Sequence, residues 1–151
     1  MIVTFCGHRN LCDNTINERL TDTITKLLLK ATTDNLPISF YCGGYGEFDY
    51  LTENVIDKVR CNFPNIRCEK VFVTPYITQS YQYRNEQMKR RFDDIIYPPI
   101  ENVPYRYAII RRNEWMINVA DFVVAYVKCS WGGAARSLEY AKRKNKNIIL
   151  I

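Results

Sequence analysis

The sequence has 151 residues, of which 47% are hydrophobic and 25% are charged, and this length suits one globular domain but not two. No apolar run approaches the roughly 18 residues that suggest a membrane-spanning helix. Residues 1–6 are too few for a signal peptide and lack its basic start, so we expect a cytoplasmic protein with no membrane partner. The net charge of +5 permits nucleic-acid binding without requiring it.

The cysteine and histidine content argues against a metal site. The six cysteines form no C-x-x-C pair, and His8 is the only histidine. We therefore expect no metal, and free thiols in a reducing compartment. Cys6, Cys42 and Cys129 fall at or near expected strand ends, where small buried residues are common, so we assign them no catalytic role.

Strands and helices are expected to alternate along the chain. Residues 2–6 form a short β-rich run, and Thr15 and Glu18 have the spacing of a capping box that begins a helix. Apolar residues at helical spacing continue this helix to about residue 34, ahead of Pro37. Further strands are expected at residues 38–42, 70–74, 95–97, 122–127 and 147–151. Further helices are expected after the turn at residues 43–49 and at residues 80–92, 105–118 and 133–144.

This order of elements predicts one α/β domain, residues 1–151, with a three-layer Rossmann-like fold in which helices flank a mostly parallel sheet. Right-handed crossovers place the carboxyl ends of its strands at one edge. Three turns should meet at that edge: Gly7-His8-Arg9, residues 43–49 and residues 130–133. Open α/β sheets bind ligands at this edge, so the three turns together predict a site for a phosphate-bearing ligand.

The last of these turns joins the apolar strand at residues 122–127 to a helix through Gly132 and Gly133. Two glycines at such a junction let backbone N–H groups approach an anion at the positive end of the helix. The same glycines are also compatible with a tight turn that binds nothing.

Several motifs resemble the SLOG superfamily, which includes the LONELY GUY phosphoribohydrolases, the YpsA-like proteins and the Smf/DprA proteins. The LONELY GUY signature P-G-G-x-G-T-x-x-E is similar to residues 131–139, W-G-G-A-A-R-S-L-E, which keep both glycines and the glutamate. The R-K-x-x-M motif of that family is similar to R-N-E-W-M at residues 112–116. The resemblance to the YpsA-like branch is broader, through F-C-G-H-R at residues 5–9 and G-G-Y-G-E-F-D at residues 43–49.

The resemblance implies a nucleotide site and, for an enzyme, a catalytic pair formed by Arg112 and Glu139. The sequence departs from the hydrolase signature at Ala135, which replaces its third glycine, and at Arg136, which replaces its threonine. Arg136 could supply charge to a phosphate instead, or could be a surface ion-pair partner. Glu139 could stabilise an oxocarbenium ion or activate water, or could simply pair with Arg143 on the helix surface.

The other candidate ligand-binding residues lie in the three turns. His8 could contact the ligand or form a structural hydrogen bond, and Arg9 could meet a phosphate. Asp49 could bind a ribose hydroxyl or stabilise the N-terminal dipole of its helix. Trp131 and Tyr45 could stack on a base. The full set of expected ligand-binding residues is Gly7, His8, Arg9, Gly43, Gly44, Gly46, Asp49, Arg112, Trp131, Gly132, Gly133 and Arg136.

Three functions are compatible with these patterns. The first is a sensor or accessory module that binds a nucleotide or an ADP-ribose-like ligand, without a further cofactor and with a homodimer as a family-level expectation. The second is a phosphoribohydrolase-like N-glycosidase acting on nucleoside 5′-monophosphates. The third is single-stranded DNA binding, as in the Smf/DprA proteins. It ranks last, and nucleic acid is not an expected partner, because the scattered arginines and the eleven tyrosines form no continuous basic stripe with aromatic platforms.

Overall fold

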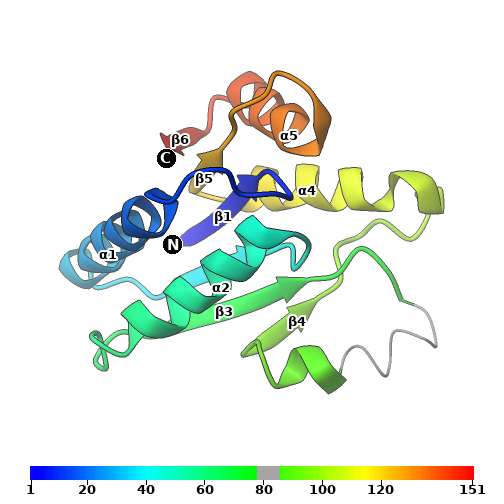
Figure 1. Cartoon of the computed structure of the whole chain (residues 1–151). Coiled ribbons are helices and arrows are strands. Elements are labelled where there is room, and N and C mark those ends of the chain that lie inside the picture. Colours follow the sequence, from blue (N-terminus) through cyan, green and yellow to red (C-terminus); the bar gives the residue numbers. More distant parts are fainter. Residues whose placement is uncertain (78–85) are drawn as a thin grey trace.

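In a computed structural model, which describes residues 1–77 and 86–151, the strands form one six-stranded sheet (Figure 1). The strands are β1 (Ile2–Gly7), β2 (Ile38–Cys42), β3 (Cys68–Val73), β4 (Asp94–Ile96), β5 (Phe122–Tyr126) and β6 (Asn147–Leu150). Their order is β4-β3-β2-β1-β5-β6, and each pair of neighbours is parallel. The predicted parallel sheet is confirmed.

Helices cover both faces of this sheet. The α-helices are α1 (Ile16–Thr33), α2 (Glu47–Arg60), α4 (Ala108–Val119) and α5 (Gly132–Arg143), and the 3₁₀ helix η1 (Tyr105–Tyr107) precedes α4. Helices α1 and α2 pack together on one face, and α4 and α5 pack together on the other (Figure 1). The chain therefore has the predicted three-layer Rossmann-like α/β architecture. None of the helices in the two described segments is both long and apolar enough to cross a lipid bilayer.

The central strands β1 and β5 contribute to both cores through the alternation of their side chains. Val3 and Phe5 point into the larger core beneath α1 and α2, together with Val124 of β5. Cys6 and Val123 point into the smaller core beneath α4 and α5. Successive side chains of a strand face opposite sides of the sheet, so a strand covered on both faces is apolar along its whole length.

The strand order reverses between β1 and β5. From β1 the chain adds β2, β3 and β4 on one side, and then returns to place β5 and β6 on the other side. Gly7 pairs with Tyr126, so the two central strands end at the same level. Ligands of open α/β sheets bind in the crevice outside such a reversal, which is where the loops after β1 and β5 leave the sheet.

The predicted capping box at the start of α1 is wrong. Thr15 has helical backbone torsions and makes no side-chain capping bond. Its hydroxyl donates to Asp13 Oδ1 at 2.7 Å, and its backbone N–H donates to the same oxygen at 2.9 Å. The carboxylate of Asp13 therefore orders the approach to the helix, because an ionised carboxylate is a stronger acceptor than a hydroxyl.

The predicted helix at residues 80–92 lies partly outside the described residues, since residues 78–85 are not described. Residues 86–89 are helical, and Met88 is buried in the core beneath α1 and α2. Lys89 and Arg90 are exposed. Arg91 is instead half-buried and pairs with Glu53 of α2, so of these three consecutive basic residues only the first two belong to the surface.

Candidate functional site

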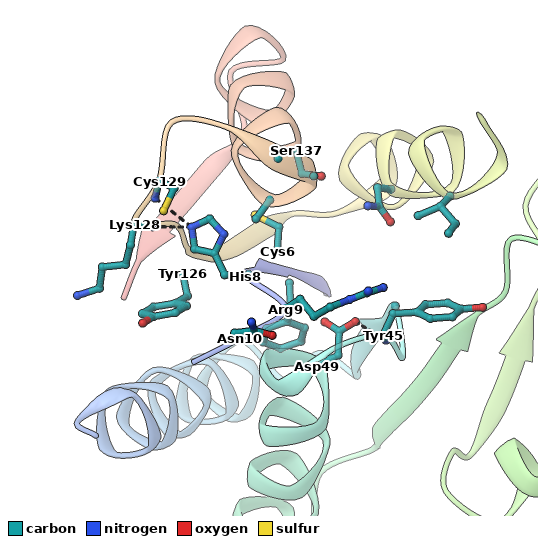
Figure 2. Close-up of a pocket in the computed structure, with 18 of the residues that line it drawn as sticks. Cys6, His8, Arg9, Asn10, Tyr45, Asp49, Tyr126, Lys128, Cys129 and Ser137 are labelled. Atoms are coloured by element: carbon teal, nitrogen blue, oxygen red, sulfur yellow. Dashed lines mark hydrogen bonds between the residues drawn. The ribbon is translucent and has the colours of Figure 1, made fainter. Parts of the chain in front are cut away.

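A cavity of about 650 Å³ lies at the reversal of strand order (Figure 2). Its walls come from the loops after β1, β2 and β5, from the inner face of α4 and from the first turn of α5. The three turns that were expected to converge all contribute to it. The predicted ligand-binding residues that line the cavity are Gly7, His8, Arg9, Gly43, Asp49, Arg112, Trp131, Gly132 and Gly133.

Arg112 lies at the floor of the cavity and ties several elements together. Its side chain is buried, with only 2% of the residue exposed. Nη1 donates hydrogen bonds to the carbonyl oxygens of Gly43 (2.8 Å) and Val73 (2.6 Å), which follow β2 and end β3. The guanidinium also lies over the ring of Tyr45, 5.6 Å from its centroid. Arg112 therefore holds strand ends in place and adds a buried positive charge beneath the ligand position.

Asp49, in the first turn of α2, is the carboxylate of the cavity. Its Oδ2 accepts a hydrogen bond from the backbone N–H of Tyr45 at 2.7 Å (Figure 2). Burial raises the pKa of Asp49 to about 6, against the opposing effects of the Tyr45 N–H and the Arg112 charge. A Cβ at Gly43 would lie 3.1 Å from this oxygen and 3.4 Å from the guanidinium nitrogens of Arg112. Glycine at position 43 thus lets the acid and the arginine approach the same backbone.

His8 lines the cavity and acts there as a hydrogen-bond acceptor. Its Nε2 accepts from the backbone N–H groups of Lys128 (2.8 Å) and Cys129 (3.0 Å) in the loop after β5 (Figure 2). Its ring also meets the edge of Tyr126, with ring centroids 6.2 Å apart and planes at 78°. His8 therefore connects the loop after β1 to the loop that leads into α5.

Two further cations lie in the loops at the cavity mouth. Arg9 is exposed, and its side chain extends across the opening toward Asp49 and Tyr45 (Figure 2). Its carbonyl oxygen accepts from the N–H of Glu47 at 2.8 Å, which holds the backbone of this loop against α2. Lys128 also lines the cavity, and its ammonium group pairs with Asp13 at 3.1 Å.

The first turn of α5 opens into the cavity. Gly132 has φ +92° and follows the N-cap residue Trp131, which is 77% exposed. A Cβ added at Gly132 or Gly133 would meet no atom within 4 Å, so the space beside both backbones is open. The first N–H groups of a helix have no partner within it, and Gly132, Gly133 and Ala134 at the start of α5 all line the cavity.

Three of the predicted glycines are required by the protein's own packing. A Cβ at Gly7 would lie 2.1 Å from the ring of Phe48, and one at Gly44 would lie 2.6 Å from the ring of Phe72. Gly44 and Gly46 also have φ values of +73° and +101°, which side chains rarely adopt. Gly44 and Gly46 do not line the cavity, so their place in the motif is explained by the turn rather than by a ligand.

Arg136 and Glu139 lie outside the cavity, contrary to the sequence-based prediction. Helix α5 turns Ala135 and Leu138 toward the sheet, so the adjacent positions 136 and 139 face solvent. The side chain of Glu139 is 63% exposed and pairs with Lys142 at 2.7 Å. This is the surface role that was the alternative for a carboxylate at this position, although with Lys142 as the partner instead of Arg143.

Several lining residues were not selected from the sequence. They include Cys6, Asn10, Asn113, Tyr126, Lys128 and Ser137. Lys128 was detectable in principle, because it directly follows the last residues of an apolar strand that ends at the ligand edge. Asn113 and Met116 carry no such signal, since only the packing of α4 decides which of its faces meets the cavity.

The lining charges favour an anion. Arg9, Arg112 and Lys128 contribute positive charge, and Asp49 contributes the single carboxylate of the lining. Within residues 1–77 and 86–151, no group of three or more histidine, cysteine, aspartate or glutamate side chains is placed to hold a metal ion. The cavity therefore offers cations, backbone amides and aromatic rings, which are groups that bind phosphates and bases.

The sequence matches no family model and no curated protein. Its structure is similar to DNA processing protein A from Helicobacter pylori, at 15% identity and a TM-score of 0.65, over 99% of this chain and 64% of that one. It is also similar to DNA processing protein A from Streptococcus pneumoniae, at 12% identity and a TM-score of 0.66, over 98% of this chain and 49% of that one. The chain thus spans less than two thirds of either protein. At these identities the likeness establishes a shared fold, and the chain has the Rossmann-like fold found in DNA processing protein A.

Proposed function

We propose that this chain binds a nucleotide or an ADP-ribose-like ligand, as a sensor or accessory module of the SLOG superfamily related to its YpsA-like branch. The observation that carries the proposal is the position of the cavity. It lies at the carboxyl ends of β1 and β5, where the strand order reverses, and the N-terminus of α5 opens into it. Open α/β sheets hold phosphate-bearing ligands in this arrangement.

Different lining residues would contact the phosphate, the ribose and the base of such a ligand. The open space beside Gly132 and Gly133 would take a phosphate, next to the backbone N–H groups of α5. Arg9 would pair with the same charge from the opposite side of the mouth. Asp49 would accept a hydrogen bond from a ribose hydroxyl, and the exposed ring of Trp131 would stack on the base.

Binding is better supported than hydrolysis, because the predicted catalytic pair is not assembled. N-glycosidic cleavage needs a carboxylate beside the bond that breaks. Glu139 is outside the cavity and paired with Lys142, while Arg112 is engaged with backbone carbonyl oxygens. Asp49 is the carboxylate that remains among the lining residues. Because cleavage needs a carboxylate, the binding experiment also measures the release of a base.

Calorimetric titration with AMP, ADP-ribose and NAD tests the proposal, followed by chromatography of the same mixtures for released base. We expect binding of at least one of the three without base release over hours. Failure of all three to bind would contradict both the sensor and the hydrolase. Release of adenine from AMP would replace the sensor with the hydrolase.

Single-stranded DNA binding is a second candidate, because the Helicobacter pylori protein with the same fold binds single-stranded DNA. Exposed aromatic residues near the cavity give it a physical basis. Trp131 lines the mouth, and Tyr105 is 70% exposed and stacks on Tyr76, with ring centroids 4.3 Å apart. Exposed rings of this kind can stack on successive bases. This candidate revises the expectation that nucleic acid is not a partner.

Fluorescence anisotropy with a labelled oligo-dT separates the two candidates. If DNA is the ligand, binding should weaken with added salt, and Trp131→Ala should weaken it about tenfold or more through the lost stacking. Tyr105→Ala should act in the same direction. No binding at low salt would exclude this candidate while leaving the small-ligand proposal intact.

A further inference from the structure

The loops after β1 and β5 are joined at two points next to the cavity. His8 Nε2 accepts the backbone N–H groups of Lys128 and Cys129, at 2.8 Å and 3.0 Å. The Lys128 ammonium pairs with Asp13 at 3.1 Å, farther along the loop that carries His8. Trp131, which lines the mouth, follows two residues after Cys129. The position of the loop that leads into α5 therefore depends on contacts made by the loop after β1.

The hydrogen bonds to His8 require one protonation state of its ring. A ring nitrogen accepts a hydrogen bond only when it carries no proton, so Nε2 is bare and the proton of the neutral ring is on Nδ1. The imidazolium form carries protons on both nitrogens and accepts nothing. Protonation would therefore turn a new N–H toward the N–H groups of Lys128 and Cys129 and break both bonds.

We propose that His8 is a positioning residue whose neutral imidazole holds the β5–α5 loop in its ligand-binding position, so that protonation of His8 releases the loop and weakens binding of the anionic ligand. This inference rests on the proposed function. It gives the only histidine of the sequence a role that acts through the backbone of another loop. It also makes ligand binding depend on the protonation state of that ring.

Charged and titratable groups from several elements surround His8. They are Arg9, Cys12 and Asp13 from its own loop, Tyr126, Lys128 and Cys129 from β5 and the loop after it, and Asp49 from α2. Hydrogen bonds from Thr15, together with Lys128, lower the pKa of Asp13 to about 2, so its ion pair with Lys128 persists in mild acid. Asp49, with a pKa of about 6, titrates in the same range as a histidine and must be controlled for.

The sign of the pH effect separates this role from a direct ligand contact. A protonated His8 in contact with a phosphate would strengthen binding as the pH falls, because it adds a positive charge. A His8 that must accept two hydrogen bonds weakens binding as the pH falls. ADP-ribose is the suitable probe, because each of its phosphates forms one ester and one anhydride bond. It therefore lacks the second ionisation near pH 6 of a phosphate monoester, and keeps its charge between about pH 5 and pH 8.

The ligand-free protein gives the first test. Because there is one histidine, its two ring nitrogens can be assigned without ambiguity in a long-range ¹H–¹⁵N correlation spectrum. The expected result is an Nδ1-protonated ring at about pH 7.5, with the amide resonances of Lys128 and Cys129 shifting when the ring gains its second proton. A ring protonated on Nε2 at that pH would overturn the proposal.

The second test compares wild type with His8→Gln, whose side-chain oxygen can accept near the Nε2 position but does not titrate. Wild-type affinity for ADP-ribose should fall about tenfold between about pH 7.5 and pH 5, and the affinity of His8→Gln should fall distinctly less. Asp49 is present in both proteins, so their difference isolates His8. His8→Ala should bind weakly at both pH values.

Two calorimetric outcomes would overturn the proposal: tighter wild-type binding in acid, or the same pH dependence in wild type and His8→Gln. The absence of binding to AMP, ADP-ribose and NAD alike at about pH 7.5 would instead contradict the proposed function. In that case the ring spectrum still decides whether His8 holds the loop, because it needs no ligand. The two failures are therefore distinguishable.

Discussion

Arg112 and Gly43 are joined by a hydrogen bond of 2.8 Å, from the guanidinium Nη1 to the backbone carbonyl oxygen. Through this bond a helix on one face of the sheet fixes the loop that follows β2 at the floor of the cavity. The same nitrogen also donates to Val73 at the end of β3. Removal of Arg112 would therefore disturb the fold and the site together, and the sharper tests use neighbouring positions.

Gly43 and Gly133 form a matched pair of positions in the cavity wall. Gly43→Ala should lower the free energy of unfolding by about 1–3 kcal/mol, because its methyl group would press on Asp49 and Arg112. Gly133→Ala should leave stability within about 1 kcal/mol of wild type, since its methyl group would enter open space in a helix. Urea unfolding measures both.

The binding results for this pair should differ from the stability results. Gly133→Ala is expected to weaken ADP-ribose binding although the protein stays folded, because the methyl group occupies the space proposed for the phosphate. Unchanged affinity in Gly133→Ala would contradict the proposal that the phosphate binds at the first turn of α5. Equal stability of the two variants would contradict the close contact at Gly43.

Asp49 should make stability fall as the pH rises. Its pKa is raised from 3.8 to about 6 in the folded state, so between these values the folded protein binds more protons than the unfolded chain. The contribution of Asp49 to the free energy of unfolding therefore decreases as the pH rises through that window, by about 3 kcal/mol in all. Asp49→Asn lacks this effect, and should gain stability relative to wild type between about pH 4 and pH 7.

Urea unfolding of wild type and Asp49→Asn at several pH values measures this difference. Other titrating groups are common to both proteins and cancel in the comparison. Parallel pH profiles would show that Asp49 titrates as an ordinary exposed carboxyl group, and would contradict its burial at the cavity floor.

Lys70 is a buried charge in β3, with 2% of its side chain exposed, and it pairs with Asp57 of α2. It also stabilises the negative charge of Glu53, which is buried nearby. Lys70→Met should lower the free energy of unfolding by roughly 3 kcal/mol, near the lower end for a broken buried pair because Asp57 is half-exposed. Lys30→Met breaks the exposed pair with Asp34 and should cost less than about 1 kcal/mol.

Chemical denaturation of both lysine variants gives the comparison. A large loss for Lys70→Met beside a small one for Lys30→Met is the expected pattern. Equal effects would mean that Lys70 reaches solvent, and that its pair with Asp57 contributes no more than a surface contact.

The fold was predictable where it depends on local patterns. The apolar run at residues 122–127 indicated a strand covered on both faces, and β5 has that position between β1 and β6. Lys70 shows where such patterns fail. A lysine within a strand suggests an exposed position, but Lys70 is buried because Asp57 of helix α2 pairs with it. Periodicity along one segment contains no information about such partners.

The site was predictable in its location and less so in its chemistry. Glycine-rich turns at the carboxyl ends of parallel strands indicated the cavity. Motif spacing suggested Glu139, but the buried positions Ala135 and Leu138 set the orientation of α5 and turn Glu139 outward. The acceptor role of His8 depends on backbone N–H groups 120 and 121 residues away, which one sequence does not reveal.

Titration calorimetry of ADP-ribose against wild type, Arg9→Ala and Arg136→Ala is the sharpest test of a ligand site at the reversal of strand order. Both arginines are exposed, but Arg9 lines the cavity and Arg136 lies on the outer face of α5. We expect wild type to bind, Arg9→Ala to bind about tenfold more weakly through the loss of a charged contact, and Arg136→Ala to match wild type. Equal loss in the two variants would contradict a ligand site at the reversal of strand order, and so would the absence of wild-type binding to ADP-ribose, AMP and NAD alike.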